Sequence, residues 1–255
     1  MTTPTSTWPR TGFQAGGGRN LFQLFCFSAG PLKADLPLSA SRFGLPTPEA
    51  VNLVQVRELT REMDSGWFDG FRAGSLRAVA IGALGDVSAL DAATQLTAVM
   101  IDREDSADLL HLQAAWATAQ WLVARGASVV LDAQTNRFWR GADVAEWPAS
   151  RPFALSIDVN VVVEAEPTSP VAHIHTRGLQ KFGRPDLVVR DVPGEQWDLV
   201  AALVRALAGQ LAMGVVLRAG DRVNIDGKSL SLAAYQPIAA DDLHLNNDGF
   251  LLTLP

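Results

Sequence analysis

The chain has 255 residues, of which 48% are hydrophobic and 19% are charged, and its formal net charge is −6. This composition is typical of a globular protein, and the length suits one large domain or two small ones. An acidic chain has no global field that attracts nucleic acid or an anionic membrane surface, so we expect neither as a partner.

The single cysteine, Cys26, lies in the apolar run 21–27, where a thiol is usually buried and unreactive. One cysteine cannot form an internal disulfide, so the sequence gives no sign of an oxidising compartment. No apolar run approaches the roughly 18 residues needed to cross a bilayer, and Gln23 interrupts the run that most resembles a signal peptide. We therefore expect a cytoplasmic protein.

The first part of the chain alternates between turn-rich and apolar segments. Residues 1–19 are rich in Thr, Pro, Ser and Gly and predict a flexible tail. Residues 21–27 indicate a buried strand. Thr47 and Pro48 have the pattern of an N-cap and first helical residue, which predicts a helix to about Met63. Further apolar runs predict strands at 79–84 and 96–101.

Two amphipathic helices are the clearest elements of the pattern. The first covers about 107–125, with Ser106 as its expected N-cap and Gly126 at its end. The second follows Asp191, the expected cap. Its apolar stripe recurs at steps of three and four, at Trp197, Val200, Val204, Leu207 and Leu211.

The segments around these helices are rich in strand-forming residues. Strands are predicted at 129–131, 138–139, 153–163, 171–176, 187–190, 215–217, 223–225, 230–232 and 250–254. Asp226-Gly227 is a strong two-residue turn signal and predicts a hairpin. Strands grouped around single helices favour an α+β fold with a largely antiparallel sheet.

The expected organisation is the 1–19 tail followed by a single α+β domain over 20–255. Two short segments within that domain look alike, because 129–133 (VVLDA) and 215–219 (VVLRA) each follow an amphipathic helix. An internal duplication would explain this likeness, with related halves at about 75–150 and 151–255. Chance similarity of a short match is the alternative.

Side chains that could bind a ligand or take part in catalysis are concentrated in the run 172–187. His173 and His175 are two residues apart on a predicted strand, so both rings point to one face. That spacing suits two ligands of zinc or iron, which need at least a third donor. The chain offers Asp186, Asp241, Asp242 and His244. The alternative is a pair of half-exposed strand histidines without a ligand role.

Three cations, Arg177, Lys181 and Arg184, surround two glycines in the predicted loop between 176 and 187. Guanidinium groups and glycine amides could together hold a phosphate or a carboxylate. The alternative is a solvated loop whose cations pair with the chain's excess acid. On the first interpretation, replacing Arg177 and Arg184 by alanine leaves the fold intact and weakens the binding of an anion.

The sequence does not match the familiar catalytic and cofactor-binding motifs that we compared with it. The stretch 227–229 (GKS) resembles the end of a phosphate-binding P-loop, but the glycine required five positions earlier is Arg222 and a predicted strand comes next. The sequence contains no Gly-x-Ser-x-Gly elbow and no Gly-x-Gly-x-x-Gly fingerprint. We therefore expect no cofactor, and a non-enzymatic role is favoured over an enzymatic one.

The segment 175–187 (HTRGLQKFGRPDL) resembles a segment in a family of uncharacterised bacterial proteins. In that family a strand ends in Thr-x-Gly-Leu or a similar sequence, followed by Lys-Phe-Gly-x-Pro and an acidic residue. The element at 129–133 is similar as well, so the resemblance covers the region from the first long helix onward. It implies a bacterial cytosolic module and, because the family is a domain of unknown function, transfers no catalytic residues.

These observations favour a soluble α+β module that acts through protein contacts or through a weak anion site at 177–184. The alternative is a metal-assisted hydrolase that uses His173 and His175.

Overall fold

The computed structural model describes residues 6–166, 168–225, 227–237 and 245–254, which group into two compact units. Unit 1 comprises Met1–Pro9, Phe22–Asp102 and Asp108–Phe153, and unit 2 comprises Arg10–Leu21, Arg103–Ala107 and Ala154–Pro255. Each unit has its own mostly antiparallel sheet with helices packed on it, which confirms the predicted α+β class. Within the described residues, no helix is both long and apolar enough to cross a membrane.

Unit 1 is built on a five-stranded sheet in the order β2-β3-β1-β4-β5. Its strands are β1 (Arg19–Ser28), β2 (Gln55–Thr60), β3 (Gln95–Glu104), β4 (Val129–Asp132) and β5 (Arg137–Arg140), although the first three residues of β1 and the last two of β3 are grouped with unit 2. The strands predicted at 21–27, 96–101, 129–131 and 138–139 are therefore confirmed. Aromatic side chains such as Phe27 and Phe68 fill the core on one face of this sheet, with Leu96 and Leu131 beside them.

Helices cover the sheet of unit 1. They are α1 (Ala40–Phe43), α2 (Ser65–Gly70), α3 (Gly74–Leu84), α4 (Ser88–Asp91), α5 (Leu110–Ala124), α6 (Gly141–Ala145) and the 3₁₀ helix η1 (Pro48–Leu53). The helix predicted at 107–125 is confirmed as α5, although Leu109, not Ser106, occupies its N-cap. Ten of its fifteen residues are buried, as expected for a helix that is rich in apolar residues.

Two predictions in unit 1 are wrong. The helix expected from Thr47 to Met63 ends at Leu53, and β2 comes directly after it. All six residues of β2 pair with β3, so long-range pairing overrides the local pattern. The strand expected at 79–84 is part of α3, because a short apolar run does not distinguish a strand from a helix.

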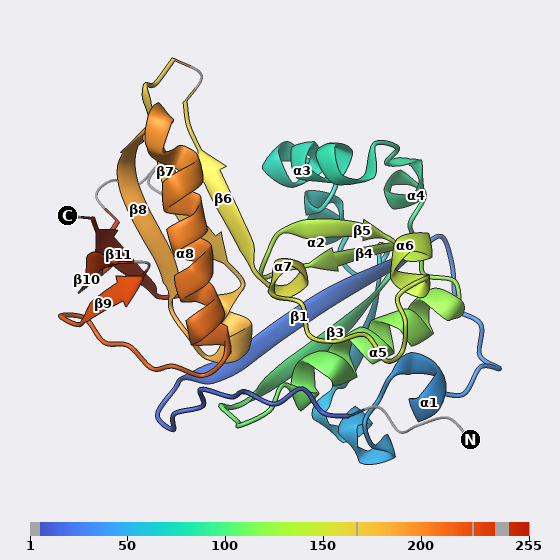
Figure 1. The fold of residues 1–255 in the computed structure, drawn as a ribbon. Coiled ribbons are helices and arrows are strands. Elements are labelled where there is room, and N and C mark those ends of the chain that lie inside the picture. Colours follow the sequence, from blue (N-terminus) through green and yellow to red (C-terminus); the bar gives the residue numbers. More distant parts are fainter. Residues whose placement is uncertain (1–5, 167, 226, 238–244, 255) are drawn as a thin grey trace. The chain divides into compact units, whose positions relative to one another are not determined.

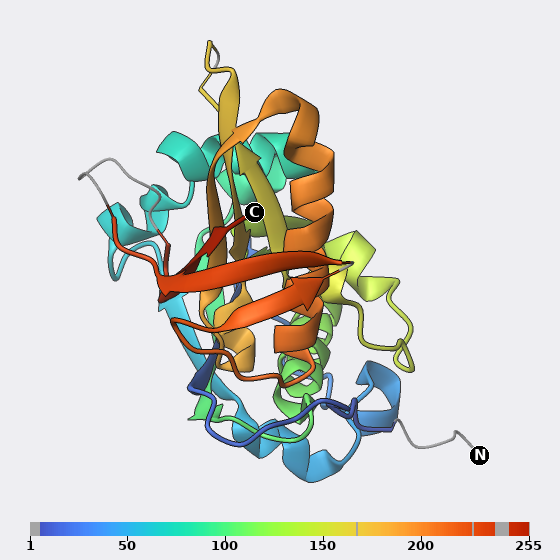
Figure 2. The same ribbon diagram turned by 60° about the vertical axis from the view of Figure 1, so that its left-hand side comes forward.

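Unit 2 is built on a six-stranded sheet in the order β6-β7-β8-β11-β10-β9. Its strands are β6 (Asn160–Glu164), β7 (Val171–Arg177), β8 (Asp186–Pro193), β9 (Arg222–Ile225), β10 (Lys228–Ala234) and β11 (Gly249–Thr253). Only β8 and β11 run parallel; the other neighbouring pairs are antiparallel. The predicted hairpin is confirmed, because Ile225 pairs with Lys228, and Figure 2 shows its two strands in orange to red.

The helices of unit 2 are α7 (Leu155–Asp158), α8 (Trp197–Ala212) and the 3₁₀ helices η2 (Leu179–Phe182) and η3 (Gly194–Gln196). Helix α8 packs against β6, β7 and β8, and Figure 1 shows it running along these strands. The predicted stripe is confirmed at Val200, Val204, Leu207 and Leu211, which are all buried. Their side chains form the helix side of the unit 2 core.

Three predictions in unit 2 are wrong. Asp191 does not cap α8; it lies inside β8 with a φ of 53°, next to a register shift between β7 and β8. Helix α7 interrupts the strand expected at 153–163. The segment 215–217 forms no regular element, whereas its look-alike 129–131 is strand β4, so the two segments do not share a structure.

The N-terminal segment, for which composition predicts a flexible tail, contributes buried side chains. Trp8 is buried in unit 1, where its backbone N–H donates to Gln113 Oε1 over 3.1 Å. Arg10 is 4% exposed and belongs to unit 2, where its Nε donates to the carbonyl of Ala212 over 2.9 Å. A composition rich in Gly and Ser does not reveal single anchoring side chains of this kind.

Candidate functional site

The segment between β7 and β8 is a compact turn built around two glycines. Gly178 and Gly183 flank η2 with φ values of 108° and 64°, a backbone region that favours glycine. A Cβ on Gly183 would lie 2.7 Å from the carbonyl oxygen of Gly18, so the turn packs closely on the N-terminal segment of unit 2. The turn is therefore a fixed part of the fold.

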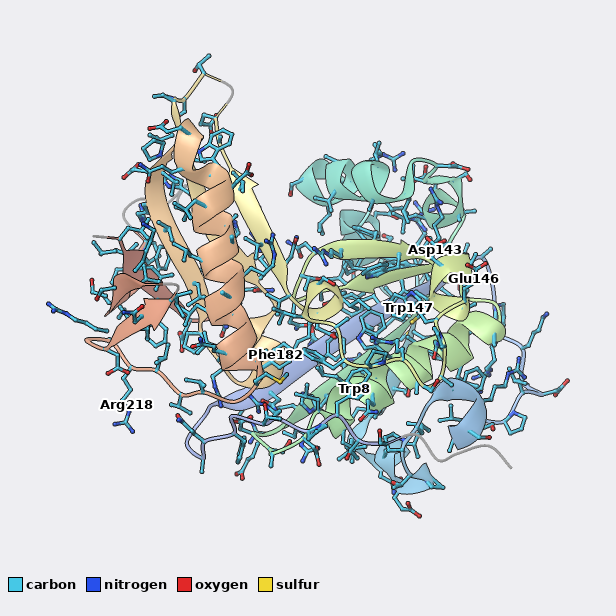
Figure 3. All side chains as sticks on the ribbon, viewed as in Figure 1. Trp8, Asp143, Glu146, Trp147, Phe182 and Arg218 are labelled. Carbon is cyan, nitrogen blue, oxygen red and sulfur yellow. The ribbon has the colours of Figure 1, made fainter. Side chains whose placement is uncertain are left out.

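Lys181, expected in a solvated loop or an anion site, is fully buried. Its Nζ lies 3.3 Å from Asp158 Oδ1, and both side chains are 0% exposed. Phe182 beside it is also buried, near the end of α8 (Figure 3). The expected pairing with acid is thus present, but the expected solvation of Lys181 is wrong.

Arg184 is also buried, in a network that joins four segments of unit 2. Its Nη1 donates to Asp105 Oδ2 over 2.7 Å, and its Nε and Nη2 donate to the carbonyls of Val215 and Gly214 over 2.8 and 2.9 Å. Arg10 pairs with the other oxygen of the Asp105 carboxylate. Two buried guanidinium groups therefore share one carboxylate, so we now expect the double replacement Arg177→Ala with Arg184→Ala to destabilise the fold.

Arg177 is the third cation of the predicted loop. It ends β7 and is partly exposed, and its side chain forms no hydrogen bond or ion pair with any residue in the described part of the chain. After burial, its charge is the next cause that lowers the pKa of His175, and it partly opposes the rise that burial produces in the pKa of Asp186. Of the three cations, it alone keeps its charged group available for another partner.

The two histidines of β7 differ in their surroundings. His175 is 0% exposed, with its Nε2 3.4 Å from Glu164 Oε2, an ion-pair distance without the geometry of a hydrogen bond. Burial lowers the pKa of His175, so its neutral form is favoured. His173 is half-buried, and its Nδ1 accepts the backbone N–H of Asp191 over 3.4 Å.

A third metal ligand does not join these histidines within the described residues. No group of three or more His, Cys, Asp or Glu side chains there could hold a metal ion. Asp241, Asp242 and His244 lie outside the described residues. The metal-assisted hydrolase therefore stays a prediction, and stoichiometric zinc, iron or manganese in the purified protein is the result that it requires.

Asp186 is a fully buried carboxylate at the start of β8. Its Oδ1 accepts the Thr176 hydroxyl over 2.7 Å and the backbone N–H of Leu179 over 3.3 Å. Its Oδ2 accepts the side-chain amide of Asn247 over 3.1 Å. Burial raises the pKa of Asp186 to about 6 despite these three hydrogen bonds.

This raised pKa predicts a pH-dependent difference between the wild type and Asp186→Asn. Because the folded protein binds the proton more tightly than the unfolded chain, Asp186 stabilises the wild type below pH 4, and this contribution is lost as pH rises through about 6. Relative to the wild type, the free energy of unfolding of Asp186→Asn should therefore rise by about 2 kcal/mol between pH 4 and pH 7. Urea unfolding at both pH values measures it, and a difference that does not change with pH would contradict the assignment.

A pocket of about 370 Å³ lies in unit 2 beside this turn. Four stretches of chain contribute most of its walls, at 16–19, 183–185, 216–217 and 247–248. Arg19 and Asp248 are its exposed charged residues, and Gln180 lines it as well. A cavity in unit 1 beside Trp8 and Trp116 measures only about 10 Å³, which holds at most one water molecule.

Two buried charged groups hold these walls. The Arg184 guanidinium lies under Gly17, where any Cβ would collide with it, and binds the carbonyls that precede the 216–217 wall. Asn247 donates to the Arg184 carbonyl over 2.7 Å and to Asp186 Oδ2, which fixes the 247–248 wall. Gly18 completes the contact, since its N–H donates to the Gly183 carbonyl over 2.9 Å.

The structure brings only part of the predicted site residues to this pocket. Arg184 supports it, whereas Arg177, Lys181, His173 and His175 do not line it. The residues that sequence reasoning missed are in the glycine run 16–18 and in the 247–248 turn. The glycine run was the available signal, but no strand precedes it and no helix comes after it, so it does not match a phosphate loop.

Comparisons of the chain with protein-family models, with curated proteins and with solved structures give no match. A function for unit 2 therefore has to be inferred from its own residues and their geometry.

Proposed function

We propose that unit 2 is a binding module for a small anionic molecule, which occupies the pocket at 16–19 and 183–185. The observation that carries this proposal is that the buried charges of Arg184 and Asp186 both hold the pocket walls. Burying a charged group costs several kcal/mol unless it is well paired, so two such groups beside one pocket indicate walls that must stay fixed. A rigid, preformed site loses less entropy when it binds its ligand.

The size and lining of the pocket favour a small ligand with a carboxylate or phosphate group. Its volume of about 370 Å³ lies in the range of ligand sites, roughly 300–1,000 Å³. Arg19, Gln180 and the backbone of the glycine run line the pocket and are the kinds of donor that such an anion requires, whereas Asp248 opposes it. The anion site that we propose therefore lies beside the N-terminal segment of unit 2, whereas the sequence predicted it within 177–184.

The residue types in the pocket favour binding over catalysis. No Ser, Cys, His or Lys is among the described residues that line it, so a nucleophile paired with a base is missing from these walls. Together with the resemblance of the segment 175–187, this supports a bacterial, cytosolic, non-enzymatic module. The bound anion then acts as a signal or as a structural ligand.

Titration with inorganic phosphate and with citrate tests this proposal. We expect saturable binding by isothermal titration calorimetry at constant ionic strength, because added salt alone screens charges. Arg19→Ala should weaken it at least tenfold, since a charge-assisted hydrogen bond is lost. Arg222→Ala removes another exposed cation of unit 2, one that does not line the pocket, and it should leave the binding unchanged.

Two results would overturn the proposal. One is the absence of saturable binding of both anions at concentrations on the order of 10 mM, where a preformed anion site should be occupied. The other is binding that Arg19→Ala and Arg222→Ala weaken to the same extent, because this would indicate a general response to positive charge.

A further inference from the structure

Strand β6 is an unprotected edge of the six-stranded sheet. It pairs with β7 on one side, from Asn160 opposite Arg177 to Glu164 opposite His173, and no strand of the described chain lies on its other side. The backbone groups of Val161, Val162 and Val163 that alternate away from β7 therefore have no strand partner among the described residues. The three central residues are valines, and Val163 is 42% exposed.

The other edge strands of the two sheets carry the charges that usually prevent edge pairing. Strand β2 has Arg57 and Glu58 at its centre, β5 has arginines at both ends, and β9 begins with Arg222. Strand β6 has no charge, proline or bulge within its valine run, and only its last residue, Glu164, is charged. Natural edge strands rarely lack all of these protections.

The sequence of β6 is complementary to itself in an antiparallel arrangement. A two-fold axis perpendicular to the sheet places a central residue opposite its own copy, and the remaining pairs are fixed by that choice. With Val162 at the centre, Val161 faces Val163 of the second copy and Asn160 faces Glu164. All five pairs are compatible, since three join valines and two join an amide to a carboxylate.

The same operation gives like-charge pairs at two centres of β2, which is the most exposed strand of unit 1. Centring the axis on Arg57 places an arginine opposite an arginine, and centring it on Glu58 places two carboxylates together. Like charges directly opposite each other destabilise a strand pair. Centring the axis on Val56 avoids these pairs but places Gln55 opposite Arg57, so β6 differs from β2 in pairing valines without a basic group, although Val56 is 49% exposed and Val163 42%.

We propose that β6 pairs with β6 of a second copy of this chain, centred on Val162, so that the two six-stranded sheets form one continuous sheet. Helix α8 packs against β6 on one face of the sheet and, among the described residues, leaves its edge without a covering helix of this unit. A five-residue edge is small compared with a standard interface of about 1,600 Å². The dimer should therefore be weak and should dissociate when the protein is diluted. This proposal does not depend on ligand binding in the pocket.

Engineered cysteines test the register directly. Opposed residues of an antiparallel pair have Cα atoms about 4.5–5.5 Å apart, within the range that a disulfide spans. Val162→Cys should therefore cross-link with itself under mild oxidation, whereas Val161→Cys and Val163→Cys should cross-link only when the two variants are mixed. The native Cys26 does not interfere, because it is fully buried and burial raises its pKa to about 12.

Sedimentation velocity over a range of protein concentrations tests the dimer itself. Val163→Lys should raise the dissociation constant at least tenfold, because a charge on the edge opposes apolar pairing. The matched control is Val56→Lys, a similarly exposed valine on β2, which should leave dimerisation unchanged. Circular dichroism establishes that each variant is folded, and Val163→Thr replaces Val163→Lys if the lysine prevents folding.

Three outcomes would overturn the inference. The wild type could remain monomeric at every concentration, or a dimer could form that Val163→Lys and Val163→Thr leave unchanged. Self-cross-linking of Val161→Cys as efficient as that of Val162→Cys would show that the strands are not paired about Val162.

Discussion

Replacing Asp105 by alanine is expected to lower the free energy of unfolding of unit 2 by about 3–5 kcal/mol. The Asp105 side chain is 5% exposed and pairs with both Arg10 and Arg184, whose side chains are 0% and 2% exposed. Alanine leaves two buried guanidinium groups close together without their shared carboxylate, so desolvation is no longer offset by attraction. Urea unfolding at pH 7, followed by circular dichroism, measures the loss.

The surface of unit 1 offers a matched control for this experiment. Asp69 also pairs with two arginines, Arg61 over 2.8 Å and Arg72 over 3.5 Å, but its side chain is 38% exposed. Solvent screens these pairs, so Asp69→Ala should cost less than about 1 kcal/mol. If Asp105→Ala costs no more than Asp69→Ala, the buried network does not hold unit 2 together.

The same variant connects stability with the pocket. Arg184 keeps its position through Asp105 and through the carbonyls of Gly214 and Val215, and it lies directly under Gly17. Loss of the carboxylate should therefore loosen the glycine wall even in molecules that stay folded. Phosphate titration of Asp105→Ala at low urea concentration, beside Asp69→Ala, distinguishes this local effect from global unfolding.

The sequence predicts those parts of the fold whose signals are local. Helices α5 and α8 were predictable because their apolar residues recur every three or four positions, and the β9–β10 hairpin because two residues join its strands. Strand β2 was not predictable, since the segment after Pro48 becomes a strand only through its pairing with β3, about 40 residues later. The apolar run in α3 fits either element.

The candidate site was less predictable, because its contacts join residues far apart in the chain. The sequence identified Arg184 as a candidate ligand-binding residue. Its partner Asp105 lies 79 residues earlier, and no motif around Asp105 predicts this pairing. Arg10 is a single cation in a stretch of disorder-like composition, and it is separated from Asp105 by 95 residues. Pairings of this kind arise from tertiary packing, to which residue spacing gives no direct access.

Replacing Lys181 by methionine is expected to cost about 3–5 kcal/mol of the free energy of unfolding. Methionine keeps the length of the side chain but removes the ammonium group that lies 3.3 Å from Asp158 Oδ1. Both side chains are 0% exposed, so Asp158 would remain as a buried carboxylate without this cation. Replacing both residues, as Lys181→Met with Asp158→Leu, removes both charges and should recover a large part of the loss. Urea unfolding of the two single variants and the double variant gives the coupling between the side chains.

The sign of this coupling decides what Lys181 does. A double variant more stable than the sum of the single effects means that the pair is structural and that the ammonium compensates for the buried carboxylate. The exposed pair Arg77–Asp91 provides the control, with side chains 36% and 43% exposed, and its coupling should be much smaller. A coupling no larger than in this control would contradict a structural ion pair.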